Sequence, residues 1–124
     1  PGVYSARFSG EGATDAKNNA SLLAKLSGIS LEKRTAHYVC HATLSDPEGN
    51  IRAEAEDICC GRILLVESGS GGFGYDPLFE IPEYHKTFGE LGPAVKAVLS
   101  HRSRAIRAIV TKIISLCLSG EWPE

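Results

Sequence analysis

The sequence predicts a mixed α/β fold. One observation is the alternation of apolar and polar residues from Thr35 to Leu44, the period of two that is typical of a half-buried strand. Another is a set of apolar residues that begins at Ile106 and recurs with helical spacing, which is the pattern of an amphipathic helix. No linker or internal repeat interrupts the 124 residues. We therefore expect residues 1–124 to form a single α/β unit.

The N-terminal part is predicted to be a loop followed by a helix. Residues 1–13 contain scattered Gly and Ser and show no apolar period, which indicates a loop. Thr14 is a suitable N-cap for a helix over Asp15–Leu26, and Gly28 supplies a stop. The apolar residues on about half of the circumference of this helix are Ala16, Ala20, Leu22, Leu23 and Leu26.

The middle of the chain is predicted to be a hairpin. The strand from Thr35 to Leu44 is followed by Asp46–Asn50, a segment rich in turn-forming residues. A second strand, Ile51–Ile58, resumes the alternation, with Arg52 among the residues on its solvent face.

Acidic and histidine residues on these two strands do not indicate a metal site. Glu54 and Glu56 are two residues apart, so they share the solvent face, and no tight turn accompanies them. His37 and His41 are four apart, a spacing that suits a helical metal site rather than one on a strand. We interpret all four as packing or solvated residues.

The C-terminal half is predicted to contain short extended segments and then helices. Ile63–Val66 reads as a short strand, and Tyr75–Ile81 reads as extended because Pro77 lacks the N–H that a helix interior needs. Pro93–Leu99 is predicted to be a short helix. The apolar stripe of the last helix consists of Ile106, Ile109, Val110, Ile113, Ile114 and Cys117.

Composition and cysteine spacing limit the partners and the compartment. The chain has 13 basic and 15 acidic residues, so it shows no basic footprint for nucleic acid. Its longest aliphatic run is far shorter than the roughly 18 apolar residues of a membrane span, so we expect neither a nucleic-acid nor a membrane partner. Cys40, Cys59, Cys60 and Cys117 are spaced poorly for a zinc site or a disulfide framework. We interpret them as structural thiols, three of which stand in strand-like or helical apolar contexts, and this fits a reducing cytoplasm.

A glycine cluster is the first candidate functional segment. Gly69, Gly71 and Gly74 match the G-x-G-x-x-G pattern of a dinucleotide-binding turn, but the residues that follow do not open a helix. Phe73 stands between glycines, where an exposed ring could form a stacking platform for a flat base. A plain flexible loop is the other interpretation of the same residues.

The start of the last helix is the second candidate. Ser100 can cap this helix, and His101 and Arg102 then lie near its N-terminus. Positive charge at this end of a helix gains nothing from the helix dipole, so contact with a carbonyl-bearing ligand would explain Arg102. The alternative is that Arg102 is a solvated surface residue that binds no ligand. Lys96, four residues before Ser100, can share the same side of the preceding short helix.

Three short motifs stand in a distinctive order: Pro1–Arg7, then Gly71–Pro77, then Ser100–Arg102. Together they resemble the inosine triphosphate pyrophosphatase family, whose members hydrolyse non-standard purine nucleoside triphosphates. The resemblance implies a three-layer α/β fold with a long mixed sheet, a homodimer, and magnesium-dependent hydrolysis of inosine and xanthosine triphosphates and their deoxy forms. The products would be the nucleoside monophosphate and pyrophosphate.

The resemblance also assigns roles to residues of this chain. It implies that Phe73 stacks on the purine and that Gly74, Tyr75 and Asp76 line the base pocket. The remaining substrate-binding residues implied are Lys96, His101 and Arg102, the last two reading the base. A fixed donor such as Arg102 suits a 6-keto purine, which presents an acceptor where adenine presents an amino donor.

The family's phosphate-binding and metal-binding segments and its general base precede the Pro-Gly motif, with which this chain starts. We therefore expect no catalytic residue and no metal ligand in this chain, and we expect the ligands of Mg²⁺ in a missing N-terminal segment. On this expectation, residues 1–124 are the C-terminal part of a pyrophosphatase domain, with a fold incomplete at the N-terminus. Such a chain would be inactive alone, would expose apolar surface, and would associate to cover it.

Two other functions stay open. A non-enzymatic purine-nucleotide-binding or regulatory domain would keep the base pocket without the chemistry. A plain α/β scaffold would bind no nucleotide at all.

Overall fold

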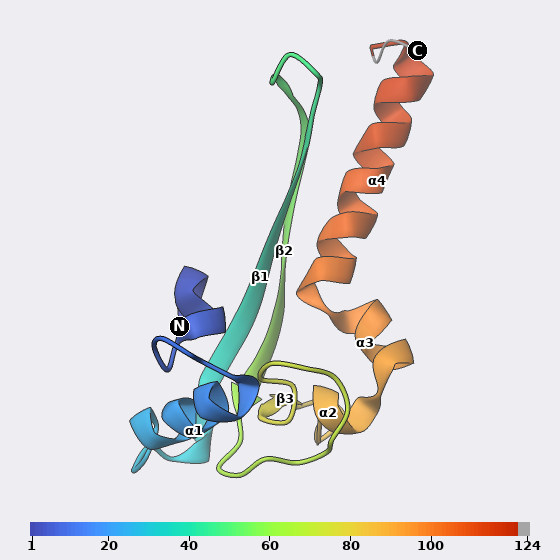
Figure 1. Ribbon diagram of the computed structural model, residues 1–124. Helices are drawn as coiled ribbons and strands as arrows, with labels where there is room; N and C mark the ends of the chain where they lie inside the picture. Colours follow the sequence, from blue (N-terminus) through green and yellow to red (C-terminus); the bar gives the residue numbers. More distant parts are fainter. Residues whose placement is uncertain (122–124) are drawn as a thin grey trace. The chain divides into compact units, whose positions relative to one another are not determined.

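The computed structural model describes residues 1–121, and these divide into two compact units (Figure 1). Unit 1 comprises Pro1–His37 and Cys60–Lys96. Unit 2 comprises Tyr38–Cys59 and the segment from Ala97 onward. The chain passes between the units within two long strands and within a short helix, and each unit is described by itself below.

The strands and helices follow one another in a mixed order, which confirms the predicted α/β class. The four-stranded sheet has the order β1-β2-β3-β4, and both β2–β3 and β3–β4 are antiparallel. The strands are β1 Thr35–Ser45, β2 Ile51–Ile63, β3 Phe79–Ile81 and β4 Lys86–Thr87. The helices are η1 Gly2–Arg7, α1 Asp15–Lys25, η2 Leu31–Lys33, α2 Phe88–Leu91, α3 Pro93–Leu99 and α4 His101–Ser119.

Strand β2 is longer than predicted, and the separate strand predicted over Ile63–Val66 is wrong. β2 continues through Gly61 and ends at Ile63. A Cβ at Gly61 would lie 2.5 Å from the Glu80 carbonyl oxygen and 2.6 Å from the Phe79 ring. Glycine at this position therefore allows β3 to approach β2 closely, instead of interrupting the strand.

The core of unit 1 contains large side chains that are completely enclosed. Leu78, Phe79, Thr87 and Phe88 are the largest fully buried side chains, and the rings of Phe79 and Phe88 stack with centroids 5.6 Å apart. Burial of each large apolar side chain contributes about 1.5–3 kcal/mol. This core lies directly beside the glycine cluster in the sequence and fixes the two ends of that loop.

Two predictions for the N-terminal part are wrong. Gly2–Arg7 forms a 3₁₀ helix and not a loop. The Thr14 cap is confirmed, because its side chain accepts a hydrogen bond from Lys17 N, but α1 turns polar residues inward: Asn18 and Asn19 are buried, whereas Ala16 and Ala20 are exposed. The asparagines are buried because their amides bond to backbone groups of neighbouring segments, which apolar side chains could not satisfy.

A buried arginine joins the end of α1 to the end of β2. Arg34 is 3% exposed, and its guanidinium donates hydrogen bonds to the carbonyl oxygens of Leu26, Ile29, Ile63 and Leu64 at 2.9–3.3 Å. Four backbone acceptors replace the water that this cation loses on burial. The connection fixes where α1 lies within unit 1.

The extended segment predicted over Tyr75–Ile81 is wrong in its first half. Residues Gly74–Leu78 form turns, in which Asp76 N donates to the Phe73 carbonyl and Leu78 N to the Tyr75 carbonyl. The Asp76 carboxylate accepts from Phe73 N and so competes with an extended backbone. Only Phe79–Ile81 is extended.

Unit 2 contains a confirmed hairpin turn. Asp46 N donates to the Asn50 carbonyl, and the Asp46 carboxylate accepts from Glu48 N and Asn50 N. These bonds hold the pKa of Asp46 below its usual value. The alternation predicted for the first strand is also confirmed, with alternate residues half-buried along β1.

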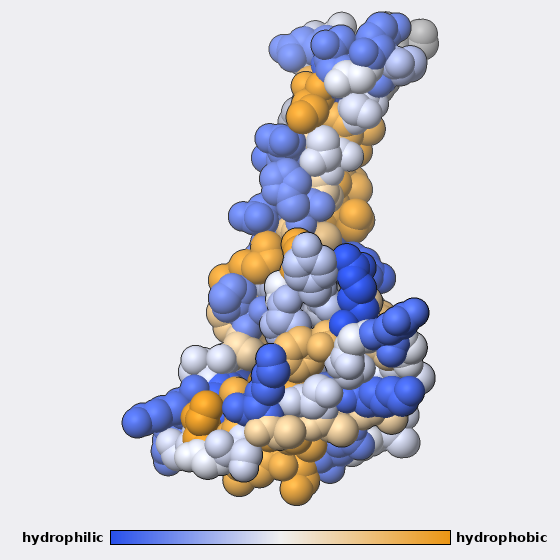
Figure 2. Space-filling model, turned by 60° about the vertical axis from the view of Figure 1, so that its left-hand side comes forward, coloured by the Kyte–Doolittle hydropathy of each residue, from blue (hydrophilic) through white to orange (hydrophobic). Residues whose placement is uncertain are grey.

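Helix α4 of unit 2 is confirmed, but its buried stripe is rotated from the predicted one. Its buried residues are Ala105 and Ile109, and Ile109 packs with Ala53 and Ala55 of β2. Ile106, Val110, Ile114 and Cys117 belong to the predicted stripe, yet all four are exposed. Figure 2 shows apolar patches on the surface of the molecule. The small Ala53 and Ala55 of β2 cover only part of the apolar surface of α4, and this surface extends around the helix beyond Ile109.

The four cysteines, which we interpret as structural thiols, differ in their burial. All are free, but only Cys59 is buried, Cys40 is half-buried, and Cys60 and Cys117 are exposed. Cys60 follows Cys59 on a strand, so it faces the opposite side. Helix α3 is confirmed with the predicted bounds.

Candidate functional site

The glycine cluster of unit 1 forms a loop that is fixed at both ends by backbone hydrogen bonds. Ser68 N donates to the Pro77 carbonyl at 2.8 Å, and Gly71 N donates to the Gly89 carbonyl at 3.0 Å. Gly89 N in turn donates to the Asp76 carbonyl at 3.0 Å. The loop is thus bonded to helix α2 and is not the plain flexible loop that was one interpretation of its sequence.

Helix α2 is itself capped by loop contacts. Thr87 accepts from Glu90 N while the Glu90 carboxylate accepts from Thr87 N, which forms a capping box. Thr87 Oγ1 also donates to the Ser68 carbonyl at 2.6 Å. The bonds from Thr87 and Ser68 lower the pKa of Glu90.

Two of the loop glycines are required by close backbone contact. A Cβ at Gly69, where φ is +85°, would lie 2.5 Å from the Gly89 carbonyl carbon. A Cβ at Gly71 would lie 2.9 Å from the Gly89 carbonyl oxygen. Contact between the loop and α2 therefore accounts for glycine at these two positions.

Asp76 is the centre of the polar contacts in this loop. It is 3% exposed, and its Oδ2 accepts from Phe73 N at 3.1 Å and from Lys96 Nζ at 2.6 Å. A buried carboxylate needs such donors to offset the loss of water. Asp76 thus brings a residue of the loop and a residue of α3 together.

Phe73 is exposed and carries a cation on its ring. The residue is 62% exposed, and Lys96 Nζ lies 4.1 Å from its ring centroid. This distance allows a cation–π attraction. The exposed ring and the adjacent ammonium present a flat apolar surface beside a strong hydrogen-bond donor, an arrangement that suits a planar ligand with an acceptor atom.

Gly74 and Tyr75 are held by the N-terminal part of unit 1. Gly74 N donates to Asp15 Oδ2 at 2.9 Å, and the Gly74 carbonyl accepts from Asn19 Nδ2 at 3.1 Å. Tyr75 is buried and its hydroxyl donates to the Ser5 carbonyl. Burial, with a smaller contribution from the charge of Asp15, raises the pKa of Tyr75 above its usual value.

The structure therefore brings five of the predicted site residues together in unit 1: Phe73, Gly74, Tyr75, Asp76 and Lys96. The sequence analysis missed the contributions of Asp15 and Asn19 to this site. Their spacing of four residues on one helix, with both side chains polar, was the available signal.

His101 and Arg102 lie in unit 2, at the start of α4. The Ser100 cap is confirmed, since its hydroxyl accepts from Ser103 N at 3.2 Å. The ring of His101 stacks on Tyr38 of β1, with centroids 4.7 Å apart and an angle of 12° between the planes. Arg102 is exposed. Tyr38 is thus a third residue that the sequence analysis missed, because the partner of a strand aromatic is set by tertiary structure.

The acidic residues of β2 form ion pairs with a histidine. His41 lies 3.6 Å from Glu54 and 3.7 Å from Glu56, and all three side chains are about half-exposed. Within residues 1–121, no group of three His, Cys, Asp or Glu side chains is placed to hold a metal ion. In the same residues, no helix is long and apolar enough to cross a membrane.

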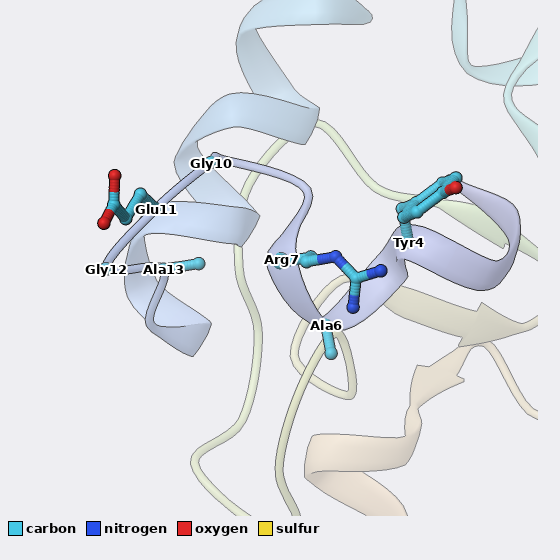
Figure 3. Close-up of a pocket in the computed structure, with 7 residues that line it drawn as sticks. All are labelled: Tyr4, Ala6, Arg7, Gly10, Glu11, Gly12 and Ala13. Atoms are coloured by element: carbon cyan, nitrogen blue, oxygen red, sulfur yellow. The ribbon is translucent and has the colours of Figure 1, made fainter.

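A hollow of about 630 Å³ lies at the N-terminal segment of unit 1 (Figure 3). Arg7 lies over the ring of Tyr4, 4.8 Å from its centroid, at one side of this hollow. The residues that line it are Tyr4, Ala6, Arg7, Gly10, Glu11, Gly12 and Ala13. None of the predicted base-binding residues lines it.

The class defined by these observations is an α/β protein with a fixed glycine loop that presents an aromatic ring. Comparison with known proteins identifies the family. The Ham1 family model matches residues 1–112. The chain therefore belongs to the Ham1 family, and the resemblance inferred from the three motifs is confirmed.

Named relatives support the same assignment. A dITP/XTP pyrophosphatase of Rhodopirellula baltica is 53% identical over 120 residues, which cover 97% of this chain and 58% of the relative. A dITP/XTP pyrophosphatase of Geobacillus kaustophilus is 46% identical, over 100% of this chain and 56% of the relative.

A solved structure shows the same fold. The Ham1 protein of Staphylococcus aureus has a TM-score of 0.82 and 35% identity, over 98% of this chain and 59% of that one. The chain thus spans a little under three fifths of the length of these relatives.

Proposed function

We propose that this chain supplies the base-recognition part of a hydrolase that converts non-standard purine nucleoside triphosphates, such as ITP, dITP and XTP, to the monophosphate and pyrophosphate. The observation that carries the proposal is the exposed Phe73 ring beside the Lys96 ammonium. The names of the relatives, dITP/XTP pyrophosphatases, support the substrate class.

The proposed recognition has two physical parts. Stacking of the purine on Phe73 contributes about 1–3 kcal/mol of affinity per base. This contribution does not depend on which polar groups the base carries. Lys96 contacts the nucleotide, and hydrogen-bond donors on His101 and Arg102 supply selectivity, because inosine and xanthosine present a 6-keto acceptor where adenine presents an amino group. A donor left unpaired against adenine costs about 1–3 kcal/mol, or roughly tenfold to a hundredfold in affinity.

Magnesium, a homodimer and a cytoplasmic location belong to the proposal. His41 lies close to both Glu54 and Glu56, and within residues 1–121 no group of three His, Cys, Asp or Glu side chains is placed to hold a metal ion. Exposed apolar residues of α4 favour self-association. The four free cysteines favour a reducing compartment.

Nucleotide binding by the purified 124-residue chain tests the proposal. We expect ITP and XTP to bind roughly tenfold to a hundredfold more tightly than ATP, and Phe73→Ala to weaken ITP binding by a similar factor. Tyr84→Ala is the matched control, since Tyr84 is an exposed aromatic residue outside the loop. Equal affinities for ITP and ATP, or no binding of either, would contradict the proposal.

A second measurement separates recognition from chemistry. With Mg²⁺ present, we expect the chain to bind ITP but to release no pyrophosphate, because we place no catalytic residue in it. Pyrophosphate release by this chain would overturn that part of the proposal and leave the recognition part in place.

A further inference from the structure

Four consecutive polar groups of the backbone, the N–H and carbonyl of Phe73 and of Gly74, form hydrogen bonds within unit 1. Phe73 N donates to the Asp76 carboxylate, and the Phe73 carbonyl accepts from Asp76 N at 3.2 Å. The next residue, Gly74, donates from its N–H to Asp15 and accepts at its carbonyl from Asn19. An exposed loop ring on a backbone with every polar group bonded is unusual, because loop backbone ordinarily bonds to water.

Asp15 and Asn19 act as a pair. They are four residues apart, so both lie on the same face of α1. Asp15 supplies an acceptor for the Gly74 N–H, and Asn19 supplies a donor for the Gly74 carbonyl. Gly74 lies 59 positions after Asp15 and 55 after Asn19 in the chain. Gly74 has a φ of +60°, and glycine adopts this conformation without strain.

The hydrogen bond from Asn19 Nδ2 to the Gly74 carbonyl is not explained by pairing of all the polar atoms of Asn19. Asn19 is 3% exposed, and its Oδ1 accepts no hydrogen bond within residues 1–121. An apolar side chain would leave no such unpaired acceptor. The feature of asparagine that this position uses is therefore the Nδ2 donor to Gly74.

We propose that Asp15 and Asn19 are positioning residues that fix Phe73 for stacking on the purine base. This inference rests on the proposed function. By holding Gly74, the pair removes backbone freedom that the loop would otherwise lose when a base binds, so that binding is stronger with no contact between α1 and the ligand.

Variants of both residues test the inference by two measurements. One is the hydrogen-exchange rate of the Gly74 amide without nucleotide, measured by NMR, and the other is the affinity for ITP. We expect Asp15→Ala to speed the exchange and weaken ITP binding, each about tenfold. Asn19→Asp keeps the size of the side chain but removes the donor, and we expect it to weaken ITP binding to a similar degree.

Two further variants distinguish positioning from other roles. Asp15→Asn loses the charge that favours a helix N-terminus but retains an oxygen that can accept from Gly74 N. Because the acceptor is retained, we expect the exchange rate and the ITP affinity of Asp15→Asn to match those of the unmodified chain. Glu32→Ala removes an exposed charge elsewhere in unit 1 and should change neither. Failure of Asp15→Asn to restore the exchange rate and the affinity would overturn the inference.

The outcomes separate this inference from the proposed function. If the unmodified chain does not bind ITP, the proposed function fails, and the positioning role fails with it, even if Gly74 exchange responds to Asp15. If the unmodified chain binds ITP but Asp15→Ala and Asn19→Asp bind it equally well, only the positioning role fails.

Discussion

Unit 1 and unit 2 bury their side chains in different ways. Unit 1 encloses two aromatic rings and Leu78 completely, and it also encloses charged or polar groups such as Arg34 and Asp76 with their hydrogen-bond partners. Among the described residues of unit 2, the buried apolar side chains are small except for Ile109: Ala53, Ala55, Cys59, Ala105 and Ile109.

The exposed surfaces differ in the same direction. Helix α4 of unit 2 leaves a row of large apolar residues exposed, spaced four apart: Ile106, Val110, Ile114 and Leu118. In unit 1, Phe73 is exposed on a loop whose backbone is fixed, and the other exposed large apolar residues form no such row along a helix: Val3, Tyr4, Ile29, Leu65, Val66 and Tyr84. The comparison indicates that unit 1 fixes its glycine loop by its own hydrogen bonds, whereas one helix of unit 2 carries a continuous apolar row that the residues of unit 2 do not cover.

The largest expected effect is on the core of unit 1. Phe88→Ala removes a side chain that is 2% exposed and stacks on Phe79, so we expect the free energy of unfolding to fall by about 3–5 kcal/mol. Val110→Ala, at a residue that is 45% exposed in unit 2, should change it by less than about 1 kcal/mol. Urea unfolding of both variants measures this difference, and similar losses would break the contrast between the units.

The next effect concerns the ion pair in the loop. Lys96→Met removes the ammonium that donates to the buried Asp76 carboxylate and keeps the hydrogen bond from the Phe73 N–H. We expect a loss of about 2–3 kcal/mol, less than the roughly 3–5 kcal/mol for a completely buried pair, because the Lys96 side chain is 23% exposed. Lys17→Met, at an exposed lysine of α1, is the control. Thermal unfolding that is equal for both variants would show that the pair contributes nothing.

A smaller effect separates two glycines of the same loop. Gly72 and Gly74 both have positive φ, but a Cβ at Gly72 would lie 2.0 Å from Asp76 Oδ2, whereas nothing lies within 4 Å of a Cβ at Gly74. We expect Gly74→Ala to cost about 1–2 kcal/mol from its backbone conformation, and Gly72→Ala to cost more because Asp76 must move. Equal unfolding midpoints for the two variants would contradict the close contact.

The smallest effect is a dependence of stability on alkaline pH. The pKa of Tyr75 is raised in the folded chain, so the unfolded chain loses its proton first as the pH rises. The contribution of Tyr75 is complete below its ordinary pKa of 10.0 and is lost as the pH rises through the folded value. Tyr75→Phe should flatten the decline of stability above about pH 10. Denaturant midpoints at several pH values measure this, and parallel curves for the two proteins would rule it out.

Much of the local structure follows from the sequence. The hairpin turn at Asp46–Asn50, the Thr14 and Ser100 caps and the bounds of α3 depend on residues close together in the chain, and all were predicted. The family also followed from short motifs, and with it the glycine loop as a candidate site.

Several of the errors share one physical cause, which is contact with distant residues. Gly61 lies inside a strand because Phe79 and Glu80 pack against it, and Asn18 lies inward because Ser9 N and the Ala6 carbonyl bond to its side chain. The predicted stripe of α4 was correct in period but not in direction, since the helix has more apolar surface than the alanines of β2 cover.

The sequence by itself determined the α/β class, the turns and caps, and the residue types available to read a base, because these depend on composition and near neighbours. Tertiary structure alone decided that Asp15 and Asn19 hold Gly74, that Asp76 joins Phe73 to Lys96, and that Tyr38 stacks on His101. Each of these pairs joins residues that are 20 or more positions apart, so no local pattern specifies it. The folded backbone brings them together, and their hydrogen bonds and ring contacts then fix the geometry.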